Sequence, residues 1–163
     1  MMATRTKARA ADLHGSDAYL WARSQADALR AGRLAELDLA HLAEEIEALA
    51  IGIRSAVRSR TRTIIEHLLK LEHSPSQEPR HGWRRTVRAA RSELRDDLTA
   101  SLRRELERDL AALYSDARDN AADDLTSYGE AGAAQALPAQ CPYSLDQIAG
   151  DWLPEARSAA SKA

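Results

Sequence analysis

The apolar residues of this chain recur at intervals of three and four, which is the spacing of one face of an α-helix. The longest run predicts a helix over about residues 36–72 that ends before Pro75. At about 1.5 Å per residue this helix would be about 55 Å long, whereas a compact domain of this size has a diameter of about 40 Å. We therefore expect the helix to bend, with Gly52 as the obvious place, or the bundle to be elongated. The apolar stripe consists of Leu39, Leu42, Ile46, Leu49, Ile53, Val57, Ile64, Leu68 and Leu71.

A first helix is predicted from Ser16, a residue suited to the N-cap position, to Ala31. Gly32 follows at the position where many helices end in a left-handed residue. The apolar face of this helix is thin and consists of Tyr19, Ala22, Ala26 and Leu29.

Two more helices are predicted after a loop over residues 74–82, which contains two prolines and a glycine. We expect a break between these helices at residues 99–101, with Ser101 as the cap of the second. The apolar face of the third helix consists of Trp83, Val87, Ala90, Leu94 and Leu98. The apolar face of the fourth helix consists of Leu102, Leu106, Leu110, Leu113, Ala117 and Ala121.

The last part of the chain is predicted to be a tail with little regular structure. Residues 129–142 are rich in glycine and proline and are expected to be irregular. Ser144 and Gln147 have the spacing of a capping box, which predicts a short helix over residues 144–149. We expect residues 151–154, which include a tryptophan and a leucine, to dock the tail on the bundle.

The composition agrees with an all-α fold. Phe is absent, Gly and Pro number only 7 and 5, and the abundant Ala, Leu, Arg and Glu are the best helix formers. We predict a single helical bundle of four main helices with the C-terminal tail docked on it. The bundle domain is expected over residues 16–154, after a disordered basic arm at residues 1–15 and before a flexible tail at residues 155–163.

The ends of the chain and its single cysteine favour a cytoplasmic protein. Cys141 has no second cysteine with which to form an internal disulfide. The N-terminus lacks the apolar run of a secretory signal, and no apolar stretch approaches the roughly 20 residues that cross a bilayer. We expect no membrane partner and no cofactor.

The charges nearly cancel over the whole chain, with 23 Lys and Arg against 25 Asp and Glu. This balance removes the simplest argument for a nucleic-acid-binding protein, which is a strongly basic chain. The cancellation conceals a polarised sequence, because residues 51–104 carry 13 basic and 6 acidic side chains whereas residues 105–163 carry 4 and 11. These segments should neutralise each other or present faces of opposite sign to partners.

Helical spacing gathers these charges into three faces. One arginine face, on the predicted long helix, consists of Arg54, Arg58 and Arg62. The other, on the third helix, consists of Arg84, Arg88, Arg91 and Arg95. The acidic face of the fourth helix consists of Glu105, Asp109, Asp116, Asp119 and Asp123. We predict that the arginine faces pair with the acidic face, within one chain or across a dimer. The alternative is that they track nucleic-acid phosphates, although the aromatic residues expected for stacking on single strands are missing from them.

A histidine and carboxylate cluster lies near the start of the predicted long helix. His41 and Glu45 are one turn apart, and Asp38 lies one turn before His41. Together with His67 these are ligand types for zinc, iron or manganese, so a metal-binding bundle that uses His41, Glu45 and His67 is an alternative hypothesis. The favoured interpretation is that the acidic residues complement the start of a helix and that His67 is a hydrogen-bonded, partly buried histidine.

Short segments in a fixed order resemble a bacterial family catalogued as domain of unknown function twenty-nine, over about residues 17–154. Leu71 and Tyr143 depart from the pattern, since an aromatic residue and a Trp are expected there. The resemblance implies a helical bundle and brings no established activity. The matching segments include Tyr19-Leu20-Trp21, Gly32-Arg33, Glu36-Leu37-Asp38, residues 42–47, His67-Leu68-Leu69-Lys70, Cys141-Pro142-Tyr143 and residues 151–154.

No motif of an enzyme accompanies these patterns. Cys141 has no histidine near it in sequence, and the chain contains neither a Gly-x-Ser-x-Gly elbow nor a glycine-rich phosphate loop. We therefore assign no catalytic, cofactor-binding or metal-binding residue. We predict a non-enzymatic interaction protein whose charged helix faces bind a second copy or an acidic or basic protein partner, with nucleic acid less favoured.

Overall fold

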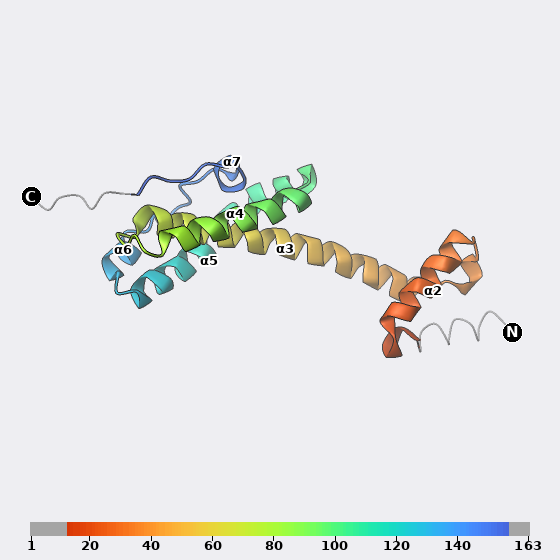
Figure 1. Ribbon diagram of the computed structural model, residues 1–163. Coiled ribbons are helices and arrows are strands. Elements are labelled where there is room, and N and C mark those ends of the chain that lie inside the picture. Colours follow the sequence, from red (N-terminus) through yellow and green to blue (C-terminus); the bar gives the residue numbers. More distant parts are fainter. Residues whose placement is uncertain (1–12, 157–163) are drawn as a thin grey trace, which may run out of the picture. The chain divides into compact units, whose positions relative to one another are not determined.

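The computed structural model describes residues 13–156 and is entirely helical in its regular structure (Figure 1). This confirms the all-α fold class with four substantial helices. The predicted basic arm and the end of the predicted tail fall largely outside the described residues. After a helical turn at residues 13–16, the elements are α2 (Ala18–Arg30), η1 (Leu34–Glu36), α3 (Leu39–His73), α4 (Arg80–Asp97), α5 (Ala100–Ser127), α6 (Ala131–Gln135) and α7 (Leu145–Ala149).

The chain divides between Gly52 and Ile53 into two compact units. Unit 1 contains α2, η1 and the first part of α3, and unit 2 contains the remainder of α3 with α4 to α7. Gly52, which the sequence indicated as a place for a bend, is therefore the last residue of unit 1. Among the described residues, no helix combines the length and the apolar character needed to cross a membrane.

Unit 1 is organised by the contact between α2 and the start of α3. Asp17 caps α2, since its Oδ1 accepts a hydrogen bond from the Leu20 amide at 3.0 Å; the prediction of Ser16 as the cap was wrong by one residue. Gly32 has φ +68° after the helix, as predicted. The buried Gln25 accepts a hydrogen bond from the backbone amide of Asp38 at 2.8 Å, which ties α2 to the first turn of α3.

The predicted apolar face of α2 was wrong. Trp21 and Ala28 are buried, whereas Tyr19 and Leu29 are exposed. Trp21 carries the largest apolar surface of this helix, and burying it turns Tyr19, which lies on nearly the opposite side of the helix, towards solvent.

The N-terminal part of the α3 stripe was expected to be core, and this expectation was also wrong. Its large apolar side chains are between 41% and 66% exposed, and the described residues of this chain do not cover them. From Val57 onwards the same stripe is buried, as predicted. We call the N-terminal part of this face the exposed stripe. It consists of the half-buried Leu42 and the exposed Leu39, Ile46, Leu49 and Ile53.

The core of unit 2 forms where α3 lies between α4 and α5 (Figure 1). Ile65 and Leu69, which lie beside the apolar stripe and are not part of it, are completely buried as well, so α3 packs on two sides. Burying one such aliphatic side chain contributes about 1.5–3 kcal/mol. The core residues contributed by α4 and α5 include Trp83, Val87, Leu94, Leu106, Leu113 and Leu125.

The connections in unit 2 agree with the predictions in part. α7 has the predicted capping box between Ser144 and Gln147. α6 lies in a segment that was expected to be irregular. The break between α4 and α5 is present, but the cap of α5 is Thr99 and not Ser101, because the Thr99 hydroxyl accepts a hydrogen bond from the Leu102 amide at 3.4 Å.

Replacing Thr99 by Ala should lower the free energy of unfolding of the protein by about 1 kcal/mol, because the start of α5 loses its side-chain cap. Ser101→Ala is the matched control and should change it by less than about 0.5 kcal/mol. Urea denaturation followed by circular dichroism measures both values. A larger loss in Ser101→Ala than in Thr99→Ala would contradict the assignment of the cap.

Candidate functional site

The arginine face of α3 pairs with the acidic face of α5 within unit 2. Arg54 Nε lies 2.7 Å from Glu105 Oε2, and Arg62 Nη1 lies 3.5 Å from Asp116 Oδ2. Asp109 contacts both Arg54 and Arg58. The pairing predicted from the charge pattern is therefore present inside one chain. Because these groups are partly exposed, each pair contributes only about 0.2–1 kcal/mol, and its main effect is to define how α3 and α5 align.

Asp119 and Asp123, the other two residues of the acidic face, form no ion pair with the arginine face of α3 in the described part of the chain. Asp119 lies 3.7 Å from its neighbour Arg118. One residue beyond the predicted face, Asp124 binds the buried ammonium of Lys70 at 2.7 Å. Arg60, which lies outside the predicted arginine face, binds Glu93 and Asp97 of α4. Both sides of α3 are thus connected to their neighbouring helices by ion pairs.

Among the described residues, the arginine face of α4 forms no ion pair with α5, so the pairing predicted for this face is not present within the chain, and its pairing across a dimer stays a prediction. Arg91 is buried and donates three hydrogen bonds to backbone carbonyls of the C-terminal segment: to Ile148 at 2.9 Å and to Gln147 and Trp152 at 2.7 Å each. Burial lowers the pKa of its guanidinium, and the charge of Asp151 offsets part of this effect, although arginine stays charged at neutral pH. This contact docks the predicted tail on the bundle.

A small open cavity of about 260 Å³ lies where the arginine face of α4 meets the C-terminal segment. We call it the arginine groove. Arg95 Nη1 lies 3.6 Å from Asp151 Oδ1 at this place, whereas Arg84 and Arg88 have no ion pair among the described residues. Among the described residues, the groove is lined by α4 and the C-terminal segment; the lining residues are Arg84, Val87, Arg88, Arg91, Arg95, Asp151 and Leu153.

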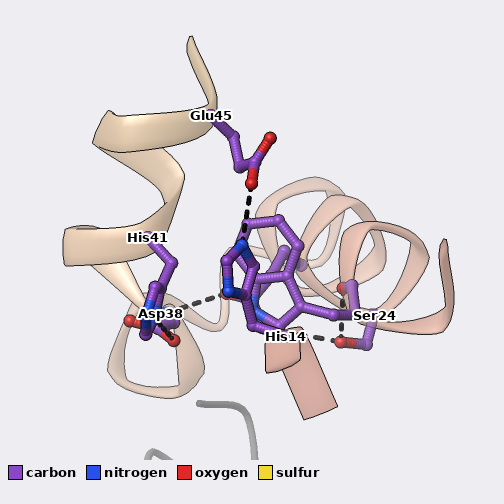
Figure 2. A network of polar contacts seen from close by, with 7 residues as sticks. His14, Ser24, Asp38, His41 and Glu45 are labelled. Atoms are coloured by element: carbon purple, nitrogen blue, oxygen red, sulfur yellow. Dashed lines mark hydrogen bonds and ion pairs between the residues drawn. The ribbon is translucent and has the colours of Figure 1, made fainter. Parts of the chain in front are cut away.

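A second polar network lies in unit 1 (Figure 2). His41 Nδ1 lies 2.7 Å from Asp38 Oδ2, and His14 Nε2 lies 2.8 Å from Glu45 Oε1. The two imidazole rings stack with their centroids 4.3 Å apart, and the Trp21 ring meets His14 edge-on at 4.6 Å. Asp38, His41 and Glu45 were recognisable from the sequence, whereas His14 was not, because no helical periodicity relates it to a residue 31 positions later.

The metal-binding alternative gains no support from these positions. His41 and Glu45 belong to the network of unit 1, where each contacts a different partner, whereas His67 belongs to unit 2. The ring of His67 lies 2.9 Å from the Thr63 carbonyl, and burial, followed by the charge of Lys70, lowers its pKa. Within residues 13–156, no group of three or more His, Cys, Asp or Glu side chains is arranged to hold a metal ion.

Cys141 lies in a packed region next to two tyrosines. Its Sγ contacts the Tyr143 carbonyl oxygen at 3.4 Å, and burial raises the pKa of the thiol. An activated cysteine nucleophile has a lowered pKa instead. Tyr143 donates a hydrogen bond to Glu72 at 2.7 Å, and burial raises the pKa of Tyr114 to about 12. Burial favours the uncharged forms of the Cys141 thiol and of both tyrosine hydroxyls. The hydrogen bonds from Tyr143 to Glu72 and from Tyr114 to the Pro138 carbonyl connect the C-terminal segment to α3 and α5.

The Asp38 and His41 pair should make unit 1 sensitive to pH. The hydrogen bond with Asp38 raises the pKa of His41. Burial alone would raise the pKa of Asp38, but its hydrogen bonds with His41 and the charge of His41 together lower it. The Asp38 and His41 pair therefore stabilises unit 1 fully between about pH 4 and 6.5, where Asp38 is ionised and His41 is protonated. This stabilisation is lost as the pH rises through the raised pKa of His41, and also as the pH falls through the lowered pKa of Asp38.

We expect Asp38→Asn to return the pKa of His41 towards about 6.5, the ordinary histidine value. The measurement is an NMR titration of the His41 ring protons. Glu47→Gln removes a carboxylate of the same helix that makes no contact with His41, and it should leave the titration unchanged. An unaltered His41 titration in Asp38→Asn would contradict the assignment of Asp38 as the main cause.

Comparison with known proteins places the chain in a family. A family model described as "Domain of unknown function DUF29" matches residues 13–153, which include every helix from α2 to α7. No curated protein and no solved structure matches the chain. The resemblance inferred from short segments is confirmed, and this protein belongs to the family of domain of unknown function DUF29.

Proposed function

We propose that this protein is a non-enzymatic interaction protein that self-associates through the exposed stripe of α3. The observation that carries this proposal is the exposure of Leu39, Ile46, Leu49 and Ile53 along one helix face. Apolar surface removed from water contributes about 25 cal/mol per Å², and apolar patches on a protein surface commonly mark interfaces.

The arginine face of α3 and the acidic face of α5, which the sequence favoured as part of the interaction surface, are less suited to bind a partner. Arg54, Arg58 and Arg62 already contact carboxylates of α5. A partner would have to replace these pairs with pairs of similar strength, so it would gain little. The same engagement argues against the nucleic-acid alternative for this face of α3.

A second copy of the chain suits the exposed stripe because the same apolar face is then present on both sides of the interface. Leu39, Ile46, Leu49 and Ile53 recur along this face at helical spacing, so two such faces can pack against each other along their length. An interface in which one face meets its own copy has the two-fold symmetry typical of homodimers.

The test is the mass of the protein in solution as a function of concentration, measured by light scattering after gel filtration. We expect a dimer for the wild type and a monomer for the Ile46→Glu, Leu49→Glu double variant, because the new charges cannot be buried at the interface. Tyr128→Glu alters an exposed apolar residue of unit 2 and is the control that should remain dimeric.

Two results would contradict the proposal. One is a monomeric wild type at every concentration up to its solubility limit. The other is a dimer that dissociates when the salt concentration is raised, because salt screens ion pairs and leaves apolar contacts intact. The second result would assign the interface to the charged faces.

A further inference from the structure

We propose that the arginine groove of unit 2 is a binding site for the phosphate group of a small molecule. The site is separate from the exposed stripe, so it does not depend on self-association. The groove has an excess of positive charge, one wall that is held in place, and the size of a small ligand.

The groove holds more positive charge than its surroundings neutralise. Four arginines line it against one carboxylate, that of Asp151, which lies 3.6 Å from Arg95. Arg84 and Arg88 have no ion pair among the described residues. The arginines of α3 differ in this respect, since each of Arg54, Arg58, Arg60 and Arg62 contacts a carboxylate. Unpaired arginines next to one another repel, and an anion between them removes this repulsion.

One wall of the groove is held in place by Arg91. Its Nε and Nη2 bind three carbonyls of the C-terminal segment, and its Nη1 makes no hydrogen bond within the described part of the chain. The guanidinium is therefore fixed by neutral acceptors and keeps its full charge. A preorganised arginine loses little side-chain freedom when it binds an anion, and its planar donors match the oxygens of a phosphate group.

The dimensions favour a small ligand over a nucleic acid. The cavity of about 260 Å³ is slightly below the roughly 300–1,000 Å³ of pockets that hold drug-sized molecules. Val87 and Leu153 offer a limited apolar contact for the organic part of such a ligand. None of the lining residues is aromatic, whereas sites for single-stranded nucleic acid use aromatic rings on which bases stack.

The experiment is isothermal titration calorimetry of the full chain at low salt, with pyrophosphate and glycerol 3-phosphate as probes. We expect saturable binding of one probe molecule per chain. The Arg84→Gln, Arg88→Gln double variant should weaken binding by about tenfold or more, because charge-assisted hydrogen bonds are lost. Arg85→Gln is the matched control, since Arg85 is an exposed arginine of the same helix outside the groove, and it should bind as the wild type does.

A variant with higher affinity separates loss of binding from loss of folding. Asp151→Asn removes the one carboxylate that lines the groove among the described residues, and we expect it to bind pyrophosphate several-fold more tightly. Thermal denaturation should give the same midpoint for the double variant as for the wild type, because Arg84 and Arg88 are exposed.

Three results would overturn the proposal. The first is no saturable binding of either probe by the wild type. The second is an equal loss of affinity in Arg85→Gln, which would indicate general electrostatic attraction. The third is binding of a single-stranded oligonucleotide by a protein that binds neither small probe, which would assign the groove to nucleic acid.

Discussion

Burial of the C-terminal part of α3 on two sides is the constraint on which unit 2 depends. Ile64, Ile65, Leu68 and Leu69 are all inaccessible to solvent, so α4 and α5 must both pack on this helix. Even Lys70 is only 3% exposed, and its ammonium is held by Glu66 and Asp124 at 2.7 Å each. A buried charge of this kind is tolerated only because it is paired.

This packing also decides which surfaces remain available. With α5 on one side and α4 on the other, the arginines of α3 meet carboxylates of their own chain and are neutralised. The opposite face of α4 meets no acidic helix, and the C-terminal segment that covers it contacts Arg91 through carbonyl groups. Arg84 and Arg88 therefore have no carboxylate partner among the described residues and line the arginine groove, while large apolar side chains remain exposed along the exposed stripe of α3.

Sequence periodicity predicted the helices well because it reports which residues share a face. It could not tell that Leu49 is exposed and Leu68 is buried, because the same spacing occurs whether or not a neighbouring helix covers that face. The α3 and α5 ion pairs were predictable from complementary charges, whereas the contacts of Arg91 were not, because backbone carbonyls leave no mark in a charge pattern. His14 was missed for a similar reason, since its contacts join residues far apart in the sequence.

The C-terminal part of α3 is a core helix, and we propose that a second copy of the chain covers its N-terminal part. Hydrogen exchange of the α3 amides, measured by NMR or mass spectrometry over a range of protein concentrations, tests it most directly. We expect slow exchange over residues 64–71 at every concentration, and exchange over residues 39–53 that slows as the concentration rises. Equal protection of both segments at the lowest concentration would contradict it, because the stripe would then be covered within one chain.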